Sequence, residues 1–161
     1  SAKAMAKRSN LMSDHYQWQR DSDTISTDPA QLDVEMIHQF LTTSYWVPGI
    51  ERRTVEISIE NSLCFGLYHE TKQIGFARIV TDFASFAYLL DVFVVEQVRA
   101  QGLGKWLIAC ILECPALDLL PSIGLATRDA HSFYEAFGWE RLSSADHLMR
   151  LTRIPRPTPD V

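Results

Sequence analysis

Hydrophobic residues recur along this chain with two periods, and their order predicts an α/β fold. Apolar runs bounded by turn residues predict strands at 63–68, 73–81 and 86–95. Apolar positions three or four residues apart predict helices at 28–43, 54–61, from a glycine turn to about 114, and 129–137. Weaker patterns predict further strands at 16–26, 123–126, 139–142 and 147–151. Because tight hairpins join the middle strands, the order β-α-α-β-β-β-α-β-α-β-β indicates a mixed sheet with helices on both faces, not a doubly wound parallel sheet.

Capping residues place the ends of two of these helices. Asp28 followed by Pro29 suits the start of the first helix, and Gln31 stands at the capping-box spacing. Asp129 is the expected cap of the last helix, and Gly138 suits its C-terminal end.

The central strand is followed by a glycine turn and then a helix, and this order makes an anion site. The strand LLDVFVV (89–95) is apolar except for Asp91, which is typical of a strand buried on both faces. The turn RAQGLGK (99–105) leads into the helix, whose first amide hydrogens lack intrahelical partners and carry the positive end of the helix dipole. Gly102 and Gly104 let a phosphate approach the backbone closely.

Two familiar phosphate-binding patterns do not fit this turn. A P-loop requires Gly-x-x-x-x-Gly-Lys-Ser/Thr, but Arg99 stands at its first glycine and Trp106 at its hydroxyl residue. A dinucleotide fingerprint requires a third glycine where this chain has Leu107. What remains is the pattern Arg-x-x-Gly-x-Gly directly after a hydrophobic strand, or a glycine-softened turn without a ligand.

Composition and charge restrict the class of protein further. The 161 residues are expected to form one domain at 16–152, after a disordered or expression-derived segment at 1–15 and before a proline-rich tail at 153–161. The net charge of −5 argues against a nucleic-acid-binding protein. The three cysteines form neither a disulfide framework nor a zinc-binding set, so we expect a cytoplasmic protein without a metal. No apolar run is long enough to span a membrane, and no membrane partner is expected.

The strand and glycine turn, together with three other segments, resemble the GNAT N-acetyltransferase superfamily. The sequence ATRDAHSFYEAFGW (126–139) is similar to the later motif of these enzymes, and 58–82 is similar to their paired strands. The YWVPG loop (45–49) resembles the acceptor-side loop of a bacterial subgroup of small single-domain members. The resemblance covers about 16–151 and implies the GNAT acyl-CoA N-acyltransferase fold.

The resemblance also implies a site for acetyl-CoA. Backbone groups of the central strand would contact the pantetheine arm and the thioester, at Val92, Phe93 and Val94. The pyrophosphate would bind to the main-chain amides and charges of the glycine turn, at Arg99, Ala100, Gln101, Gly102, Leu103, Gly104 and Lys105. Thr127 stands where the family commonly has an asparagine that contacts pantetheine.

Two residues are the catalytic candidates. Tyr134 matches the family's tyrosine near the coenzyme sulfur, the usual candidate to protonate the departing thiolate. Phe133 and Phe137 should pack inward and leave Tyr134 on a flank of its helix. Asp91 must be paired or hydrogen-bonded if it is buried, so it is either a structural acid beside an arginine such as Arg78, or a base or anchor for the acceptor amine.

The acceptor site is less defined by the sequence. Tyr45 and Trp46 either line an acceptor pocket or fold onto the core, and His131 either assists proton transfer or lies on the helix surface. The resemblance implies direct attack of an amine on the thioester, with a central-strand amide stabilising the developing oxyanion. The acceptor would be a small-molecule amine or a protein amino group, and family analogy suggests a homodimer. The alternatives are a non-catalytic acyl-CoA-binding domain and a partner-binding protein that keeps the fold without the ligand.

Overall fold

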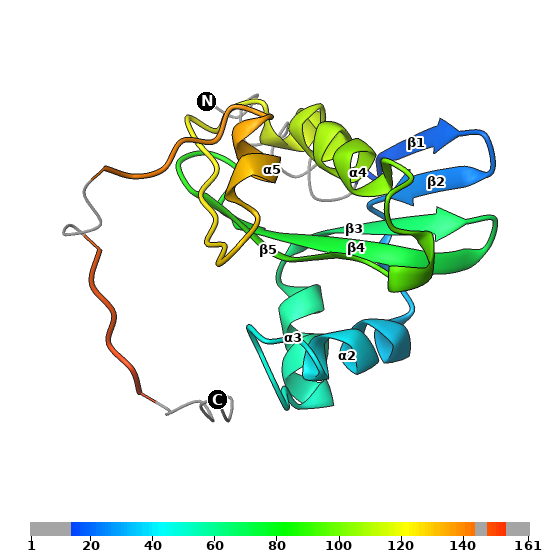
Figure 1. The fold of residues 1–161 in the computed structure, drawn as a ribbon, viewed down its shortest axis with the longest axis horizontal. Coiled ribbons are helices and arrows are strands. Elements are labelled where there is room, and N and C mark those ends of the chain that lie inside the picture. The colour runs from blue at the N-terminus through cyan, green and yellow to red at the C-terminus, as the bar shows by residue number, and fades with distance from the viewer. Residues whose placement is uncertain (1–13, 144–147, 154–161) are drawn as a thin grey trace, which may run out of the picture.

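The computed structural model describes residues 14–143 and 148–153, and it arranges them in three layers around one sheet (Figure 1). The sheet is antiparallel with strand order β1-β2-β3-β4-β5, at Gln17–Arg20, Asp23–Ser26, Leu63–His69, Lys72–Thr81 and Ala87–Val94. One face carries α2 (Val34–Thr42) and α3 (Arg52–Glu60), and the other carries α4 (Leu103–Leu112) and α5 (His131–Glu135). Three short 3-10 helices are η1 (Pro29–Gln31), η2 (Glu96–Val98) and η3 (Pro115–Leu117). The expected mixed α/β fold is confirmed.

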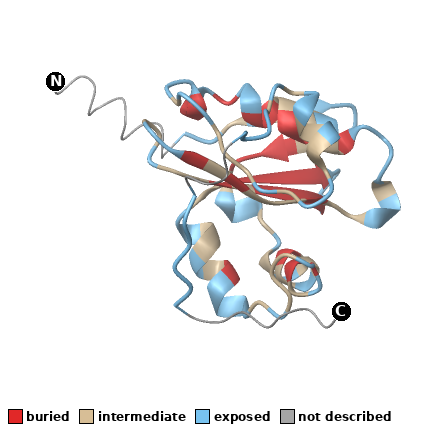
Figure 2. Ribbon diagram, turned by 60° about the vertical axis from the view of Figure 1, so that its left-hand side comes forward, coloured by how far each residue is buried: buried red, intermediate tan, exposed pale blue. Residues whose placement is uncertain are grey.

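Side-chain alternation along the strands builds a core on each face of the sheet. Phe65 and Leu67 of β3 join the core under α4, while Cys64 joins the smaller core under α2 and α3. Figure 2 shows the buried residues concentrated in the middle strands and on the helix faces turned toward them. Both faces of the central strands are therefore covered, as their apolar sequences predict.

The N-terminal part differs from the expected single strand and long helix. Residues 16–26 form a hairpin, β1 and β2, which turns at Asp21 with φ 52°. Asp28 caps only η1, since its Oδ1 accepts a hydrogen bond from the Ala30 amide at 2.9 Å. The α-helix starts five residues later, where Asp33 Oδ1 accepts from the Met36 amide at 3.0 Å. The sequence offers two aspartate caps, and the second one begins the longer helix.

The C-terminal part also differs from the prediction. In place of a strand at 123–126, a single parallel bridge joins Gly124 to Tyr88 of β5. Residues 139–142 and 148–151 have no regular secondary structure, and His147 lies outside the described residues. The expected segments before residue 14 and after residue 153 lie outside them as well. The Trp139 side chain, rather than a backbone amide, bonds the Ile123 carbonyl at 2.7 Å, so a ladder does not start there.

The cap of α5 is also not the predicted one. Ala130 occupies the N-cap position, and Thr127 Oγ1 accepts a hydrogen bond from the Ala130 amide at 3.0 Å. The carboxylate of Asp129 lies instead 3.9 Å from Arg128 Nη2. No side chain of the described residues caps the first turn of α5, and Thr127 instead holds the amide of the N-cap residue.

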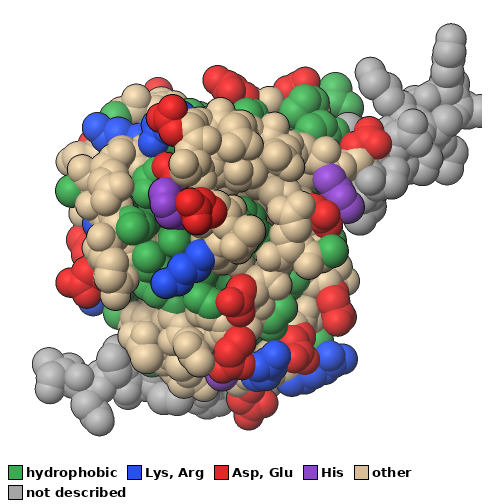
Figure 3. All heavy atoms as spheres, turned by 90° about the vertical axis from the view of Figure 1, so that its right-hand side faces the viewer, with side chains coloured by type: hydrophobic (Ala, Val, Ile, Leu, Met, Phe, Trp, Pro, Cys, Tyr) green, Lys and Arg blue, Asp and Glu red, His purple; other side chains and the backbone are tan. Residues whose placement is uncertain are grey.

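The outer surface is polar and carries mixed charge. On the face where the β1–β2 and β3–β4 turns lie, acidic and basic side chains stand side by side around hydrophobic ones (Figure 3). This face therefore presents no continuous basic patch, in keeping with the net charge of −5. No helix within the described ranges is both long and apolar enough to cross a bilayer.

Candidate functional site

A bulge near the end of β5 reverses which way its side chains face. The register between β4 and β5 shifts between Phe76 and Arg78, and Asp91 has φ 54°. In a regular strand, Leu89 and Phe93 would face the same side. Here Leu89 joins the core under α4 and Phe93 the core under α2 and α3, because the bulge inverts the alternation.

Asp91, at the bulge, is held by donors on both carboxylate oxygens. Its side chain is 7% exposed, and Arg78 Nε donates to Oδ2 at 2.9 Å while Trp46 Nε1 donates to Oδ1 at 3.1 Å. Arg78 Nη1 also donates to Ser62 Oγ at 3.1 Å. Such charge-assisted bonds stabilise the ionised carboxylate. The geometry favours the paired structural acid of the two interpretations, and a role as base stays a prediction.

The loop between α2 and α3 reaches the same place through its aromatic residues. Trp46 bonds Asp91, and Tyr45 packs on Trp46 in a T-shaped contact with ring centroids 5.1 Å apart. Phe40 at the base of the loop stacks on Phe93, with ring centroids 3.7 Å apart. The loop aromatics therefore fold partly onto the core, but Tyr45 remains 41% exposed.

A cation from a distant segment covers the exposed ring. The Arg128 guanidinium carbon lies 3.8 Å from the centroid of the Tyr45 ring. This contact brings the α2–α3 loop against the segment that precedes α5. Nothing in the sequence singles out Arg128, since an isolated arginine in a loop has no motif of its own.

The glycine turn leaves the first turn of α4 open. Gly102, with φ 76°, is the N-cap of α4 and has no side chain to bond the helix amides. Ala100 also has positive φ, at 65°. Within the described part of the chain, no hydrogen bond is donated by the backbone amides of Leu103, Gly104 and Lys105. These amides, at the positive end of the helix, are available to an anion, and the anion site stays a prediction.

Arg99 and Gly104 connect this turn to the end of β5 and to α5. Arg99 Nε donates to the Val94 carbonyl at 2.9 Å, and Lys105 is exposed. A Cβ atom added at Gly104 would meet only the Phe133 ring at 3.8 Å and Val94 at 3.9 Å, which are ordinary contacts. The fold therefore does not require glycine at position 104, whereas a ligand that approaches the backbone does.

Helix α5 carries Tyr134 directly after Phe133. Phe133 and Phe137 pack against the larger core, as predicted, and Tyr134 makes T-shaped contacts with Phe133 and Trp139 at 5.1 and 5.7 Å. Burial, and secondarily the nearby Tyr45 phenol, raise the pKa of Tyr134 to about 12. The phenol is therefore protonated at neutral pH, the form that a proton donor needs.

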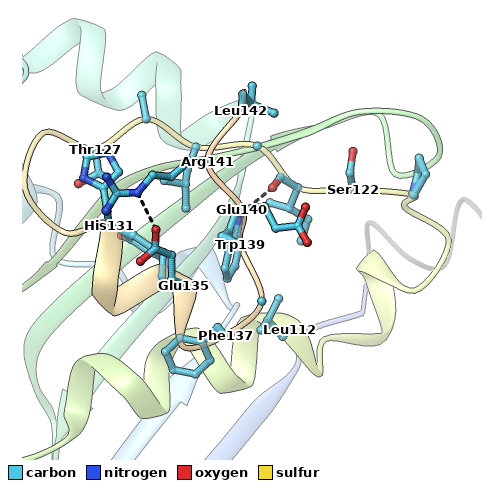
Figure 4. A pocket seen from close by; sticks show the side chains of 17 residues that line it. Leu112, Ser122, Thr127, His131, Glu135, Phe137, Trp139, Glu140, Arg141 and Leu142 are labelled. Atoms are coloured by element: carbon cyan, nitrogen blue, oxygen red, sulfur yellow. Dashed lines mark hydrogen bonds and ion pairs between the residues drawn. The ribbon is translucent and has the colours of Figure 1, made fainter. Parts of the chain in front are cut away.

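A cavity of about 820 Å³ brings three predicted site residues together. It lies between residues 121–127, α5 and residues 138–142 (Figure 4). Thr127, His131 and Tyr134 are among its lining residues. The Glu135–Arg141 ion pair, at 2.6 Å, joins two of its walls, as the figure shows.

The sequence predicts a cleft between the central strand and residues 123–126, with Tyr134 at its mouth. This cavity opens elsewhere, because no β5 residue lines it. The Gly124 amide donates to the Ala87 carbonyl at 2.9 Å and the Leu89 amide to the Gly124 carbonyl at 2.8 Å, which closes the gap at that point. Beyond this pair, in the part of the chain that the structure describes, no backbone hydrogen bond joins residues 125–127 to β5. The two segments are thus tied at one end only.

Asp82 and the three cysteines have structural surroundings. Hydrogen bonds from the Ser85 hydroxyl and from the amides of Ser85, Ala84 and Phe86 hold the pKa of Asp82 well below its usual range. Burial raises the pKa of each thiol, to about 12 at Cys64, about 12 at Cys110 and about 11 at Cys114. Among the described residues, no three His, Cys, Asp or Glu side chains gather as metal ligands.

Comparison with known proteins identifies similar sequences. A family model described as "Acetyltransferase (GNAT) domain" matches residues 60–141, about half of the chain. A protein of Gibberella zeae named "Putative acetyltransferase FG08082" is 28% identical over 116 residues. That match covers 60% of this chain and 66% of the relative, just under two thirds of its length.

Solved structures share the fold. A Xanthomonas campestris pv. campestris protein, described as a "putative acetyltransferase belonging to the gnat family", is 34% identical with a TM-score of 0.81. The match covers 88% of this chain and all of that protein. N-acetylglutamate synthase from Neisseria gonorrhoeae, complexed with coenzyme A and N-acetyl-glutamate, is 17% identical with a TM-score of 0.64, over 81% of this chain and 31% of the synthase. At that identity the likeness concerns the fold alone.

Proposed function

Because this chain belongs to the GNAT acetyltransferase family, we propose that it transfers an acetyl group from acetyl-CoA to the amine of a small molecule or a protein. The observation that carries the proposal is the junction at Gly104, where the end of β5, the open first turn of α4 and the aromatic face of α5 meet. An anion on the free amides would lie beside Val94, at the end of β5, and beside Phe133, the residue that precedes Tyr134.

The residues of the turn fit the coenzyme. The free amides from Leu103 to Lys105 would bind its pyrophosphate, and the exposed Lys105 side chain adds positive charge. Arg99, already bonded to the Val94 carbonyl, would orient the turn more than contact the phosphate. The positive φ angles of Ala100 and Gly102, on either side of Gln101, would shape the path by which the pyrophosphate approaches these amides.

The reaction would occur beside β5 and α5. Acetyl-CoA, when bound, supplies the thioester that the acceptor amine attacks. Backbone groups of Val92, Phe93 and Val94 would hold the pantetheine arm, and an amide of this strand would stabilise the oxyanion. As the C–N bond forms and the C–S bond breaks, Tyr134, protonated at neutral pH, would donate its proton to the leaving sulfur, and the proton lost by the amine nitrogen would restore the phenol. Thr127 and His131, which line the cavity with Tyr134, would face the reactants there.

A thermal-shift titration with acetyl-CoA tests the binding half of this proposal. A ligand that binds only the folded state stabilises it, by about 2.7 kcal/mol at a ligand concentration of 100 times Kd. This stabilisation appears as a higher Tm. No shift at millimolar acetyl-CoA would refute the coenzyme site. A shift without thiol release from any amine would favour the alternative, a non-catalytic acyl-CoA-binding domain.

The Tyr134→Phe variant tests the proton donor. We expect kcat to fall by about 100-fold, the lower range for general acid catalysis, with the acetyl-CoA-induced rise in Tm unchanged. Tyr68→Phe is the matched control, because Tyr68 is also a buried tyrosine with a raised pKa but lies on β3. Equal turnover of Tyr134→Phe and the control would remove Tyr134 from the mechanism.

A further inference from the structure

The contact between Arg128 and Tyr45 joins the α2–α3 loop to the segment that leads into the helix of the proposed proton donor. Arg128 lies in the chain between Thr127, which lines the cavity, and α5, which carries Tyr134. Its guanidinium carbon is 3.8 Å from the centroid of the Tyr45 ring. The cation is therefore fixed over the loop aromatics, one residue along the chain from the cavity lining.

The platform under Arg128 is rigid. Tyr45 packs edge-on against Trp46, and Trp46 Nε1 is bonded to Asp91, whose side chain is 7% exposed. The guanidinium is therefore stacked on a ring that is itself anchored to the bulge of β5. An arginine stacked on an aromatic ring keeps its edge, with its N–H donors, available to a planar anion.

Arg128 is weakly paired, unlike the other arginines near this region. Arg78 is committed to Asp91 at 2.9 Å, with only 14% of its side chain exposed, and Arg141 is bonded to Glu135 at 2.6 Å. The acid beside Arg128 is Asp129, at 3.9 Å, and both side chains are 67% exposed. An ion pair of this length and exposure is weak, so the guanidinium can bind a ligand anion instead.

We propose that the acetyl acceptor is a small amine that also carries a carboxylate, as an amino acid does, and that Arg128 binds this carboxylate while the amine faces the thioester. The inference rests on the proposed acetyl transfer and deepens it. A guanidinium and a carboxylate match as a planar, two-bond pair, which a lysine cannot reproduce. Arg128 is then the specificity-determining residue, and Tyr45 is the surface that positions it.

Paired acceptors that differ only at the carboxylate test this assignment. Free-thiol release from acetyl-CoA would be measured with a series of amino acids and with their carboxamides. We expect kcat/KM of the wild-type protein to be about 10- to 100-fold higher for the acids, as a charge-assisted bond implies. The amines of the carboxamides are less basic, so a larger fraction of them is unprotonated and able to attack at neutral pH. A preference for the acids would therefore not come from the amount of reactive amine. Equal values, or a preference for the amides, would overturn the inference.

Variants of Arg128 separate recognition from folding. Arg128→Gln should raise KM for the acids about 10- to 100-fold, leave kcat nearly unchanged and leave the amides unaffected. Arg128→Lys should restore part of the lost affinity, since it keeps the charge but not the two-bond geometry. Arg20→Gln is the control, because Arg20 also lies over an aromatic ring, 4.8 Å from the Trp106 centroid, but on the edge strand β1. An equal loss for acids and amides in Arg128→Gln would overturn the proposal.

Two further arms distinguish this inference from the proposed function. Ethanolamine phosphate is compared with ethanolamine to test whether a phosphate can replace the carboxylate. If kcat/KM rises more between this pair than between any amide and its acid, the carboxylate assignment is overturned. The acetyl-CoA thermal shift is recorded in parallel on every variant. Suppose that acetyl-CoA raises Tm, but that acetyl is transferred only to amines without an anionic group or to no acceptor at all. That result overturns the inference about Arg128. The absence of a shift would refute the coenzyme site itself.

Discussion

Replacing Asp91 with alanine should strongly destabilise the protein. The substitution would leave Arg78 with only 14% of its side chain exposed and without its carboxylate, and breaking a buried pair on one side costs about 3–5 kcal/mol. Trp46 would lose its acceptor too, and alanine is disfavoured at φ 54° by about 1 kcal/mol. Against a total stability of about 5–15 kcal/mol, this loss is large.

The Asp91→Asn variant separates charge from geometry. Asparagine tolerates positive φ and can still accept from Trp46, so the loss should be smaller, about 1–3 kcal/mol, and should come from the ion pair. Urea denaturation at pH 7, followed by tryptophan fluorescence, measures both variants, since Trp46 contacts the substituted group. Glu56→Gln, which breaks exposed pairs on α3, is the control and should change stability by less than about 0.5 kcal/mol.

A double-mutant cycle of Asp91→Asn with Arg78→Gln decides the interpretation. If the pair is structural, the coupling energy should exceed about 1 kcal/mol, and turnover per folded molecule at saturating acceptor should stay near that of the wild-type protein. A loss below about 1 kcal/mol in Asp91→Ala, together with no coupling, would refute the reasoning. A stable Asp91→Asn variant without turnover would instead identify Asp91 as the base.

Three further predictions follow from burial and from glycine. Tyr68→Phe should leave stability unchanged or raise it by about 1 kcal/mol in urea denaturation, because the buried Tyr68 hydroxyl has no hydrogen-bond partner among the described residues; a large loss would reveal a partner. Gly104→Ala should stabilise α4 by about 1 kcal/mol, since the added Cβ meets only ordinary contacts, yet weaken acetyl-CoA binding in the thermal-shift titration, and unchanged binding would argue against close backbone approach there. The three buried thiols should not react with a thiol reagent at pH 8 until the protein unfolds. Because their folded pKa values of about 11 to 12 lie above the ordinary value of 9, stability should be full below pH 9 and fall as pH rises toward 12, measured as Tm against pH.

The sequence predicts the elements whose periodicity is long and strong. The strands β3, β4 and β5 and the helices α3 and α4 lie within a few residues of their predicted positions, because each buries a regular apolar face. The hairpin at 16–26 was expected as one strand, since its turn at Asp21 uses a left-handed aspartate instead of a glycine. The local sequence pattern does not distinguish one strand from a hairpin, because the hairpin depends on the pairing of β2 with β3, which is distant in the sequence.

The bulge at Asp91 shows where the sequence stops being informative about the site. An acid inside an apolar strand signals a buried polar contact, and Arg78 was a candidate partner that the structure confirms. Trp46 was not, because it lies 45 residues away on a loop whose path depends on tertiary packing. The inversion of the strand, which sends Phe93 to the opposite core from Leu89, is also invisible in a pattern that is apolar on both faces.

The pairing of Asp91 changes how an acid in this strand would affect acetyl transfer. Both oxygens of this carboxylate already accept a hydrogen bond, one from Arg78 and one from Trp46. Its two bonds do fix Trp46, and through Trp46 the ring of Tyr45 on which Arg128 is stacked. The effect of Asp91 on the reaction would then be geometric. Disturbing it should appear first as weaker binding of the acceptor, in KM, while the proposed acetyl-CoA site at Gly104, between α4 and α5, stays intact.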